Sequence, residues 1–352
     1  MGEKILMKGN EAIGEAAIRA GCRVYFGYPI TPQSEITAYM AKRLLKMKDA
    51  AFVQSESEIA AINMVYGAAA TGVRAMTSSS SPGISLKQEG ISYIACAELP
   101  CVIVNIQRGG PGLGSIQPGQ ADYFQATKGG GHGDYHLIVL APSSVQELVD
   151  LTMDAFDLAD KYRNPAMILG DGLLGQMMEA VEFKRRKKVD LPDKKGWVLA
   201  GCKGRKKYCI VPFNLDPYEM ERMNFKIQEK YIKLKEKEVR YEAANLDNAD
   251  LIIIAYGTVA RIIKTVINNA KKEGINIGLI RPITLFPFPE KIIAETSEKV
   301  NKFLVVEMSL GQMVEDVKLA VNGKAEVNFY GRVGGVVPTQ SEILTEIKKY
   351  LK

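Results

Sequence analysis

Short apolar runs alternate with segments of helical periodicity along the first half of the chain. This alternation is typical of a parallel sheet whose two faces are covered by helices. The predicted strands are residues 23–26, 50–54, 73–78, 101–107, 137–140 and 166–169. The predicted helices are residues 10–20, 33–46, 57–71, 84–97 and 144–161. Asn10 and Gly21 are suited to cap the first of these helices and to end it.

The second half predicts one long helix and then a second α/β unit. Residues 218–242 carry an apolar side chain at every third or fourth position, which forms one stripe on a helix. Glu236 and Arg240, four residues apart, favour the same helix. Buried parallel strands, each followed by a helix, are predicted at residues 251–254, 275–280, 303–306 and 326–329. We therefore expect an α/β fold in three parts: residues 1–182, a basic linker and helix at 183–245, and residues 246–352.

The composition is that of a globular protein, with 47% apolar and 24% charged residues in a chain of 352. No apolar run approaches the roughly 18 residues that cross a bilayer. The first residues lack the basic and then apolar layout of a signal peptide. We therefore expect a cytoplasmic protein without a membrane segment.

One basic segment, residues 184–207, determines the sign of the net charge of +6. It holds eleven lysines or arginines against Asp190 and Asp193, a balance of +9, and the rest of the chain has 35 basic and 38 acidic residues, a balance of −3. A solvated arm between two domains is the simpler interpretation. Docking of an acidic partner protein is the alternative. Nucleic acid is not an expected partner, because no recognisable binding fold accompanies the charge.

The five cysteines, at positions 22, 96, 101, 202 and 209, are scattered and include no C-x-x-C pair. Cys96 and Cys101 match only the first spacing of a plant-type cluster motif. We interpret all five as reduced thiols and expect no iron–sulfur cluster on this chain.

The segment Tyr28-Pro29-Ile30-Thr31-Pro32 lies between a predicted strand and a predicted helix. Its two prolines fix φ on either side of Thr31, so the turn is stiff. The turn holds a hydroxyl at the carboxyl end of a strand, where open α/β sheets place ligands. The alternative is local: Thr31 would cap a helix that begins at Pro32.

Two carboxylates, Glu56 and Glu58, lie at the beginning of the predicted helix 57–71. A glutamate in a dry setting keeps its proton near neutral pH and can act as an acid. Small residues that permit close approach of another surface follow Glu58: Ala60, Ala61, Gly67, Ala68, Ala69 and Ala70. The alternative is a capping box, Ser55-x-x-Glu58, in which Glu58 satisfies a backbone amide. The residues alone leave the choice between Glu56 and Glu58 even.

Arg108 ends the predicted strand 101–107 and precedes a glycine-rich loop, residues 109–114. A guanidinium in this place is suited to bind a carboxylate with two parallel hydrogen bonds. The alternative is a surface arginine paired with a nearby acid. The loop lacks the Gly-Lys-Ser/Thr ending of a nucleotide loop, so a mobile cover over an active site fits better.

Two weaker patterns remain. His132 and His136 have the spacing of two metal ligands on one helix face, but the glycines around them argue against a helix. We therefore expect no metal site on this chain. The serines at residues 78–81, before Pro82 and Gly83, predict another strand-to-helix turn.

Together these motifs resemble the α chain of the 2-oxo-acid:ferredoxin oxidoreductases, thiamine-diphosphate enzymes that oxidatively decarboxylate 2-oxo acids. The resemblance spans nearly the whole chain, and is carried by Tyr28-Pro29-Ile30-Thr31-Pro32, Ser55-Glu56-Ser57-Glu58, Val104-Asn105-Ile106-Gln107-Arg108, His132-Gly133-Asp134 and Ile280-Arg281-Pro282. It is strongest for the branched-chain (2-oxoisovalerate) type, with the 2-oxoglutarate type close behind.

This resemblance implies a thiamine-diphosphate-binding domain of the pyrimidine type at residues 1–182 and a transketolase C-terminal-like domain at residues 246–352. It implies that Glu58 is the catalytic acid, because Glu58 keeps the family's distance to Gly67 and Ala68. It assigns Thr31 and Arg108 to the substrate. The cofactor-binding residues that it implies are Tyr28, Pro29, Ile30, Thr31 and Glu58.

The resemblance also implies that the rest of the enzyme lies on partner chains. Thiamine enzymes bind Mg²⁺-diphosphate with a motif that begins as Gly170-Asp171-Gly172 does, but the asparagine that completes it is missing around residues 196–201. The implied partners are a thiamine-diphosphate-binding β subunit, a γ subunit and a ferredoxin-like iron–sulfur subunit, which would hold Mg²⁺ and the clusters. Coenzyme A and ferredoxin are the implied acceptors.

Three alternative functions remain open. The chain could serve a 2-oxoglutarate enzyme, or be the β chain of a lipoamide-dependent 2-oxo-acid dehydrogenase, which has a similar two-domain plan. It could also be a scaffold subunit that has lost catalysis. The joint presence of Thr31, Glu58 and Arg108 favours an enzyme.

Overall fold

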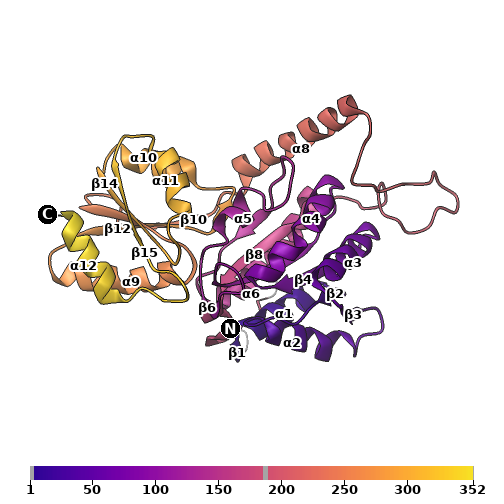
Figure 1. Ribbon diagram of the computed structural model, residues 1–352, viewed down its shortest axis with the longest axis horizontal. Helices are drawn as coiled ribbons and strands as arrows, with labels where there is room; N and C mark the ends of the chain where they lie inside the picture. Colours follow the sequence, from indigo (N-terminus) through magenta and orange to yellow (C-terminus); the bar gives the residue numbers. More distant parts are fainter. Residues whose placement is uncertain (1–3, 185–188, 352) are drawn as a thin grey trace.

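The computed structural model describes residues 4–184 and 189–351, in which two α/β units lie side by side (Figure 1). The sheet of the first unit has the order β13-β7-β8-β5-β4-β2-β3. All six predicted strands are present, as β2 (Val24–Gly27), β3 (Ala51–Gln54), β4 (Ala75–Ser79), β5 (Val102–Gly109), β7 (Ile138–Leu140) and β8 (Ala166–Asp171). Neighbours from β7 to β3 are parallel, as predicted. Helices cover the sheet, and every residue of β4, β5, β7 and β8 is buried.

The predicted helices of this unit are α1 (Gly9–Arg19), α2 (Ser34–Leu44), α3 (Glu58–Ala70), α4 (Ser81–Cys96) and α6 (Val145–Tyr162). The end of α1 is as predicted: Gly21 has φ +85°, a conformation that glycine adopts without strain. The prediction for its beginning is wrong. Asn10 lies inside the helix, and its amide donates a 2.7 Å hydrogen bond to the carbonyl of Pro32. Asn10 therefore ties α1 to the turn before α2.

Five short elements of this unit have no signal in the sequence. They are β1 (Lys4–Lys8) and β9 (Met178–Glu182), which pair with each other, β6 (Ser115–Pro118), α5 (Tyr123–Thr127) and α7 (Gly172–Gln176). None exceeds five residues, which is too short to display a period.

The predicted long helix is α8 (Pro217–Lys237), which ends before residue 242. Its buried stripe packs on the first unit and consists of Ile227, Tyr231 and Leu234. Arg240 lies beyond the helix and pairs with Asp154 of α6 at 2.5 Å rather than with Glu236. The chain then enters β10 (Tyr241–Ala244).

The sheet of the second unit has the order β10-β12-β11-β14-β15. The four predicted strands are β11 (Leu251–Ile254), β12 (Ile277–Pro282), β14 (Lys302–Glu307) and β15 (Glu326–Gly331), and they are parallel as expected. The helices of this unit are α9 (Gly257–Lys272), α10 (Glu290–Ser297), α11 (Met313–Val321) and α12 (Gln340–Leu351). β10 adds an antiparallel edge.

Two strands do not follow the predicted division of the chain. β13 (Thr284–Phe286) follows β12, yet it pairs antiparallel with β7 of the first sheet. β10 precedes residue 246 but belongs to the second sheet. The division into residues 1–182, 183–245 and 246–352 therefore stays a prediction.

Buried polar contacts hold the two units together. The side-chain amide of Gln120, which is 1% exposed, donates to the carbonyl of Tyr256 at 3.1 Å, and its oxygen accepts from the Met308 amide at 3.0 Å. Arg281 of β12 is 2% exposed and donates to both carboxylate oxygens of Glu147 in α6, at 2.9 and 2.8 Å. This bidentate pair fixes both the distance and the orientation of the units.

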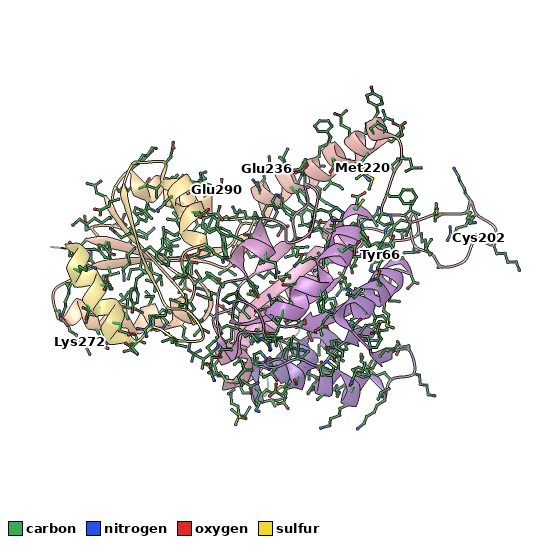
Figure 2. The ribbon with its side chains drawn as sticks, viewed as in Figure 1. Tyr66, Cys202, Met220, Glu236, Lys272 and Glu290 are labelled. Atoms are coloured by element: carbon green, nitrogen blue, oxygen red, sulfur yellow. The ribbon has the colours of Figure 1, made fainter. Side chains whose placement is uncertain are left out.

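Residues 189–215 form an arm outside both sheets, and Cys202 lies at its outer end (Figure 2). Four basic residues of the segment 184–207, at positions 185–188, lie outside the described residues. The base of the arm contacts α3: the Tyr66 hydroxyl donates to the carbonyl of Ile210 at 3.2 Å. The five cysteines are free in this structure: Cys22 and Cys101 are buried, Cys96 is half-buried, and Cys202 and Cys209 are exposed. Within residues 4–184 and 189–351, no helix is long and apolar enough to cross a membrane.

Candidate active site

Four adjacent strands of the first sheet, in the order β5-β4-β2-β3, end at one edge because they are parallel. The residues that follow these ends include Thr31 after β2 and Glu58 after β3, and Arg108 is the penultimate residue of β5. A serine-rich turn follows β4. The topology thus collects, at one edge, residues that are far apart in the sequence.

The turn after β2 presents its residues outward. Thr31 is exposed, Tyr28 is 39% exposed, and Ile30 is half-buried. The alternative that Thr31 caps a helix is wrong, because α2 begins at Ser34 with Gln33 at its cap position. The turn has little freedom, since the Pro32 carbonyl accepts hydrogen bonds from the side-chain amides of Asn10 and Gln176.

Arg108 and Thr31 are in direct contact. Nη1 of Arg108 donates to the Thr31 carbonyl at 2.9 Å, and Nη2 donates to the Leu113 carbonyl at 2.7 Å. Arg108 is 8% exposed, and its Nε has no hydrogen-bond partner among the residues described. The alternative of a surface arginine paired with an acid is therefore wrong. Backbone carbonyls hold the guanidinium in place, and no carboxylate among the described residues forms an ion pair with it.

Glu58 is the first residue of α3 and is 5% exposed. The alternative of a capping box formed by Ser55 and Glu58 is wrong: α3 is capped by Ser57, whose hydroxyl accepts from the Ala60 amide at 3.1 Å. The Ser55 hydroxyl instead donates to the Gly27 carbonyl at 3.1 Å. Glu56 is exposed. Burial therefore distinguishes the two carboxylates: Glu58 is shielded from water and Glu56 is not.

The Glu58 carboxyl lies against the beginning of α4. A side-chain carbon at Gly83 would come within 2.5 Å of Glu58 Oε1 and 2.1 Å of Ser79 Oγ, so the absence of one keeps this space open. Three buried polar atoms of the surrounding turns have no partner among the described residues: Ser79 Oγ, Ser80 Oγ and Gln33 Nε2. A buried carboxyl beside unpaired polar atoms suits the edge of a nitrogen-containing ring.

The serine-rich turn is the predicted strand-to-helix turn between β4 and α4. The Ser78 hydroxyl lies 2.6 Å from the Tyr25 hydroxyl and donates to Gln33 Oε1 at 2.5 Å. The Ser81 hydroxyl accepts from the Arg108 amide at 3.1 Å and donates to Asp122 at 2.6 Å. These bonds join the ends of β2, β4 and β5 into one rigid edge.

Other sequence candidates have structural partners. Asp171 caps α7 by accepting from the amides of Leu173 and Leu174 at 3.0 and 3.1 Å, and burial raises its pKa. His136 lies outside the helices, stacks on Phe286 with ring centroids 4.1 Å apart, and its Nδ1 lies 3.0 Å from the Thr127 carbonyl. His136 therefore packs the first unit against β13.

Two residues near the site were not singled out by motif. Asp122, whose pKa is raised by burial, accepts from Ser81 and also from the Asn105 amide at 2.8 Å. Lys87 of α4 is fully buried, and its Nζ donates to the backbone carbonyl of Glu58 at 3.4 Å. The one sequence signal for Lys87 is its place one helical turn after Gly83.

The fold and this edge define a class, the thiamine-diphosphate-binding subunits of 2-oxo-acid oxidoreductases. The chain belongs to that family: the model described as pyruvate flavodoxin/ferredoxin oxidoreductase, thiamine diphosphate-binding, matches residues 15–245. The model of pyruvate:ferredoxin oxidoreductase core domain II matches residues 249–343. These matches confirm the resemblance, and the chain is an oxidoreductase subunit.

The chain is similar to individual members of this family along nearly its whole length. The chain is 52% identical to ketoisovalerate oxidoreductase subunit VorB of Methanothermobacter marburgensis, over 98% of this chain and 97% of that protein. It is 38% identical to 2-oxoglutarate synthase subunit KorA of the same organism, over 99% of both.

Solved structures confirm the fold. The chain resembles the 2-oxoglutarate:ferredoxin oxidoreductase from Magnetococcus marinus, with a TM-score of 0.88 and 27% identity, and it spans 66% of the length of that chain. A split-gene transketolase matches with a TM-score of 0.61 at 14% identity, a likeness of fold alone. Both support the expected α/β architecture of a thiamine-diphosphate-binding domain and a transketolase-like domain.

Proposed function

We propose that this chain is the α subunit of a multi-subunit 2-oxo-acid:ferredoxin oxidoreductase that converts 2-oxoisovalerate to an acyl-CoA and CO₂. One observation carries the proposal. Buried Glu58 lies at the same sheet edge as an Arg108 that is bonded to the turn of Thr31. The 52% identity to a ketoisovalerate oxidoreductase subunit favours the branched-chain acid over 2-oxoglutarate.

The residues present fit the pyrimidine half of thiamine diphosphate. When bound, this cofactor supplies a carbon nucleophile toward the carbonyl of the 2-oxo acid. Glu58 would hold a proton at its carboxyl, facing a ring nitrogen, and pass it to that nitrogen. The unpaired polar atoms of Ser79, Ser80 and Gln33 would meet the ring's polar edge. Tyr28, Pro29 and Ile30 would form the neighbouring wall of the pocket.

Arg108 and Thr31 would orient the substrate. The Nε of Arg108 is unpaired, and its charge attracts the carboxylate of a 2-oxo acid. The Thr31 hydroxyl lies on an exposed residue of a fixed turn, where it can donate to the substrate's carbonyl oxygen. The loop at residues 110–114 is exposed and could cover this place, as its glycines predict.

Partner chains would complete the site. Asp171 caps α7, so the Gly170-Asp171-Gly172 segment is engaged in the fold of this chain. A β subunit would therefore bind the diphosphate and Mg²⁺, and a γ subunit and a ferredoxin-like subunit would complete the complex. Iron–sulfur clusters on those chains would pass two electrons singly to ferredoxin, and coenzyme A would accept the acyl group. We propose that this complex is located in the cytoplasm.

Helix α3 offers a surface for such a partner. It is apolar around most of its circumference, and Ile59 and Met64 are 51% and 38% exposed. A side-chain carbon at Gly67 would meet nothing within 4 Å, so this face is open and flat. An apolar helix face of this kind is stable in water mainly when another surface covers it.

The test of the function is a pair of matched variants in the complex reconstituted with its partner chains. Glu58→Gln is expected to lower turnover of 2-oxoisovalerate by about 10²- to 10⁴-fold, the usual contribution of a positioned acid. Glu56→Gln, in the exposed neighbour, is expected to leave turnover unchanged. Measured with ferredoxin reduction as the readout, equal turnover in both variants would support a scaffold and contradict the proposal.

Substrate choice is tested with the same complex. We expect kcat/KM to be higher for 2-oxoisovalerate than for 2-oxoglutarate, because a branched-chain acid lacks the second carboxylate that a further cation must bind. The reverse order would assign the chain to the 2-oxoglutarate type.

A further inference from the structure

Lys87 is a buried cation beside the proposed acid, and the mechanism described so far does not use it. It is one of the largest fully buried side chains in the described residues, with 0% exposure. Its Nζ makes one long hydrogen bond, 3.4 Å, to the backbone carbonyl of Glu58. A lysine has three donors and a high desolvation cost, so a lysine buried with so little compensation points to a role other than stability.

The helix geometry places Lys87 and the Glu58 carboxyl on the same side of α4. Gly83 and Lys87 are four residues apart and therefore share one face. Gly83 borders the Glu58 carboxyl, and Lys87 reaches the Glu58 carbonyl. One turn of α4 thus borders the Glu58 carboxyl and bonds the Glu58 carbonyl.

The charged surroundings of Lys87 are simple. Burial lowers the pKa of Lys87 to about 8, and the charge of Glu58 opposes this effect. Other titratable groups also lie near this end of α4. Ser81 of α4 bonds the Arg108 amide and the Asp122 carboxylate. The Tyr135 hydroxyl lies 3.5 Å from the Gln88 side chain. Of these groups, Glu58 is the one whose charge acts on Lys87.

We propose that Lys87 is a positioning residue for Glu58: its buried ammonium, bonded to the Glu58 carbonyl, fixes the first turn of α3 and so keeps the Glu58 carboxyl in its place beside Gly83. This inference rests on the proposed function. Lys87 acts through Glu58 and need not touch substrate or cofactor.

The first measurement is activity of the reconstituted complex with Lys87→Met, which keeps the side chain's length and removes its charge. We expect kcat to fall about tenfold, with little change in KM for 2-oxoisovalerate, because a small displacement of a positioned acid strongly reduces its effect. Lys87→Gln, which retains a donor for the Glu58 carbonyl, is expected to keep kcat closer to that of the wild type.

The second measurement needs no cofactor and follows thermal unfolding of the full chain from pH 7 to 10. Because the pKa of Lys87 is about 8 when folded and near 10.5 when unfolded, the unfolded chain binds the extra proton between these values. The stability of the wild type should therefore rise with pH over this interval relative to Lys87→Met. Lys230→Met is the matched control, since burial lowers the pKa of Lys230 also to about 8, but Lys230 pairs with Glu98 on α8's side of the molecule.

The outcomes separate the two proposals. Lys230→Met should show the same stability trend with an unchanged kcat and pH profile. If Lys87→Met lowers the melting temperature but leaves kcat as in wild type, Lys87 is structural and the inference is wrong. A loss of kcat in Lys87→Gln as large as that in Lys87→Met would contradict positioning through the Glu58 carbonyl. If Glu58→Gln retains full turnover, the proposed function itself falls, whatever Lys87 does.

Discussion

Glu58, Thr31 and Arg108 differ in how the fold fixes them. Glu58 is fixed by burial at the beginning of a helix, Thr31 by a turn whose Pro32 carbonyl is bonded to neighbouring side chains, and Arg108 by two backbone carbonyls. Only Arg108 relies on the planar fork of its own side chain to stay in position.

Replacing Arg108 tests this point. Arg108→Lys keeps the charge but cannot donate to the Thr31 and Leu113 carbonyls from one planar group. Each lost hydrogen bond from a charged donor is worth about 1.5–3 kcal/mol, so kcat/KM for the 2-oxo acid should fall by roughly 10- to 100-fold. Steady-state kinetics of the complex measure this loss. Arg222→Lys, at an exposed arginine of α8, is the control and should have wild-type kinetics.

Sequence motifs singled out the three residues but did not predict their surroundings. The spacing of Ser55 and Glu58 predicts a capping box, yet the actual cap is Ser57, because the chain turns two residues later. Lys87 lies in the segment Leu86-Lys87-Gln88-Glu89, which has the composition of an exposed helix surface. Its burial depends on how α3 packs on α4, and no local pattern contains that information.

At the scale of elements, the pairing of α3 with α4 positions the Glu58 carboxyl. The contact depends on Gly83, whose missing side chain leaves room for Glu58 Oε1 and Ser79 Oγ. Gly67 of α3 differs, since it faces open space. These two helical glycines therefore have opposite roles in the isolated chain.

Alanine at each glycine separates the roles. Gly83→Ala is expected to push Glu58 aside and lower kcat at least tenfold, because a 1 Å displacement of an acid strongly reduces its effect. Gly67→Ala is expected to raise the unfolding free energy of the isolated chain by about 1 kcal/mol, since alanine favours a helix over glycine. Chemical unfolding and turnover are measured on both variants. Wild-type turnover in Gly83→Ala would contradict the position assigned to Glu58.

The periodic elements were predictable, and the exceptions have physical reasons. The strands and helices of the first sheet have clear apolar periods, and the structure contains all of them. α8 ends earlier than the pattern of Glu236 and Arg240 indicates, because Arg240 pairs with Asp154 of α6. β13 has three residues, and its partner β7 lies far away in sequence, so tertiary pairing alone defines it.

At the scale of the whole molecule, Arg281 connects the two units. It donates to Glu147 of α6 and, at 2.8 Å, to Glu242 of β10, while its own side chain is almost completely buried. The Ile280-Arg281-Pro282 motif therefore has a structural explanation in the interface. The two carboxylates are about one-third exposed and can be hydrated if the arginine is lost.

Arg281→Met should destabilise the chain by about 2–4 kcal/mol, somewhat less than loss of one member of a fully buried pair. Urea unfolding measures this difference, and a second transition would show that the units have become uncoupled. Lys264→Met removes a half-exposed partner of the same Glu242, and should change stability by less than about 1 kcal/mol. Equal effects of the two variants would contradict a special role for Arg281.

The pairing of β13 with the first sheet also constrains biosynthesis. When the ribosome has released β7, its outer edge has no partner until residues 284–286 emerge much later. Unpaired strand edges can pair with other chains. A nascent or truncated N-terminal fragment therefore has an aggregation-prone strand edge, which β13 covers in the folded protein. Splitting the gene between the two halves would therefore give insoluble pieces rather than two working modules.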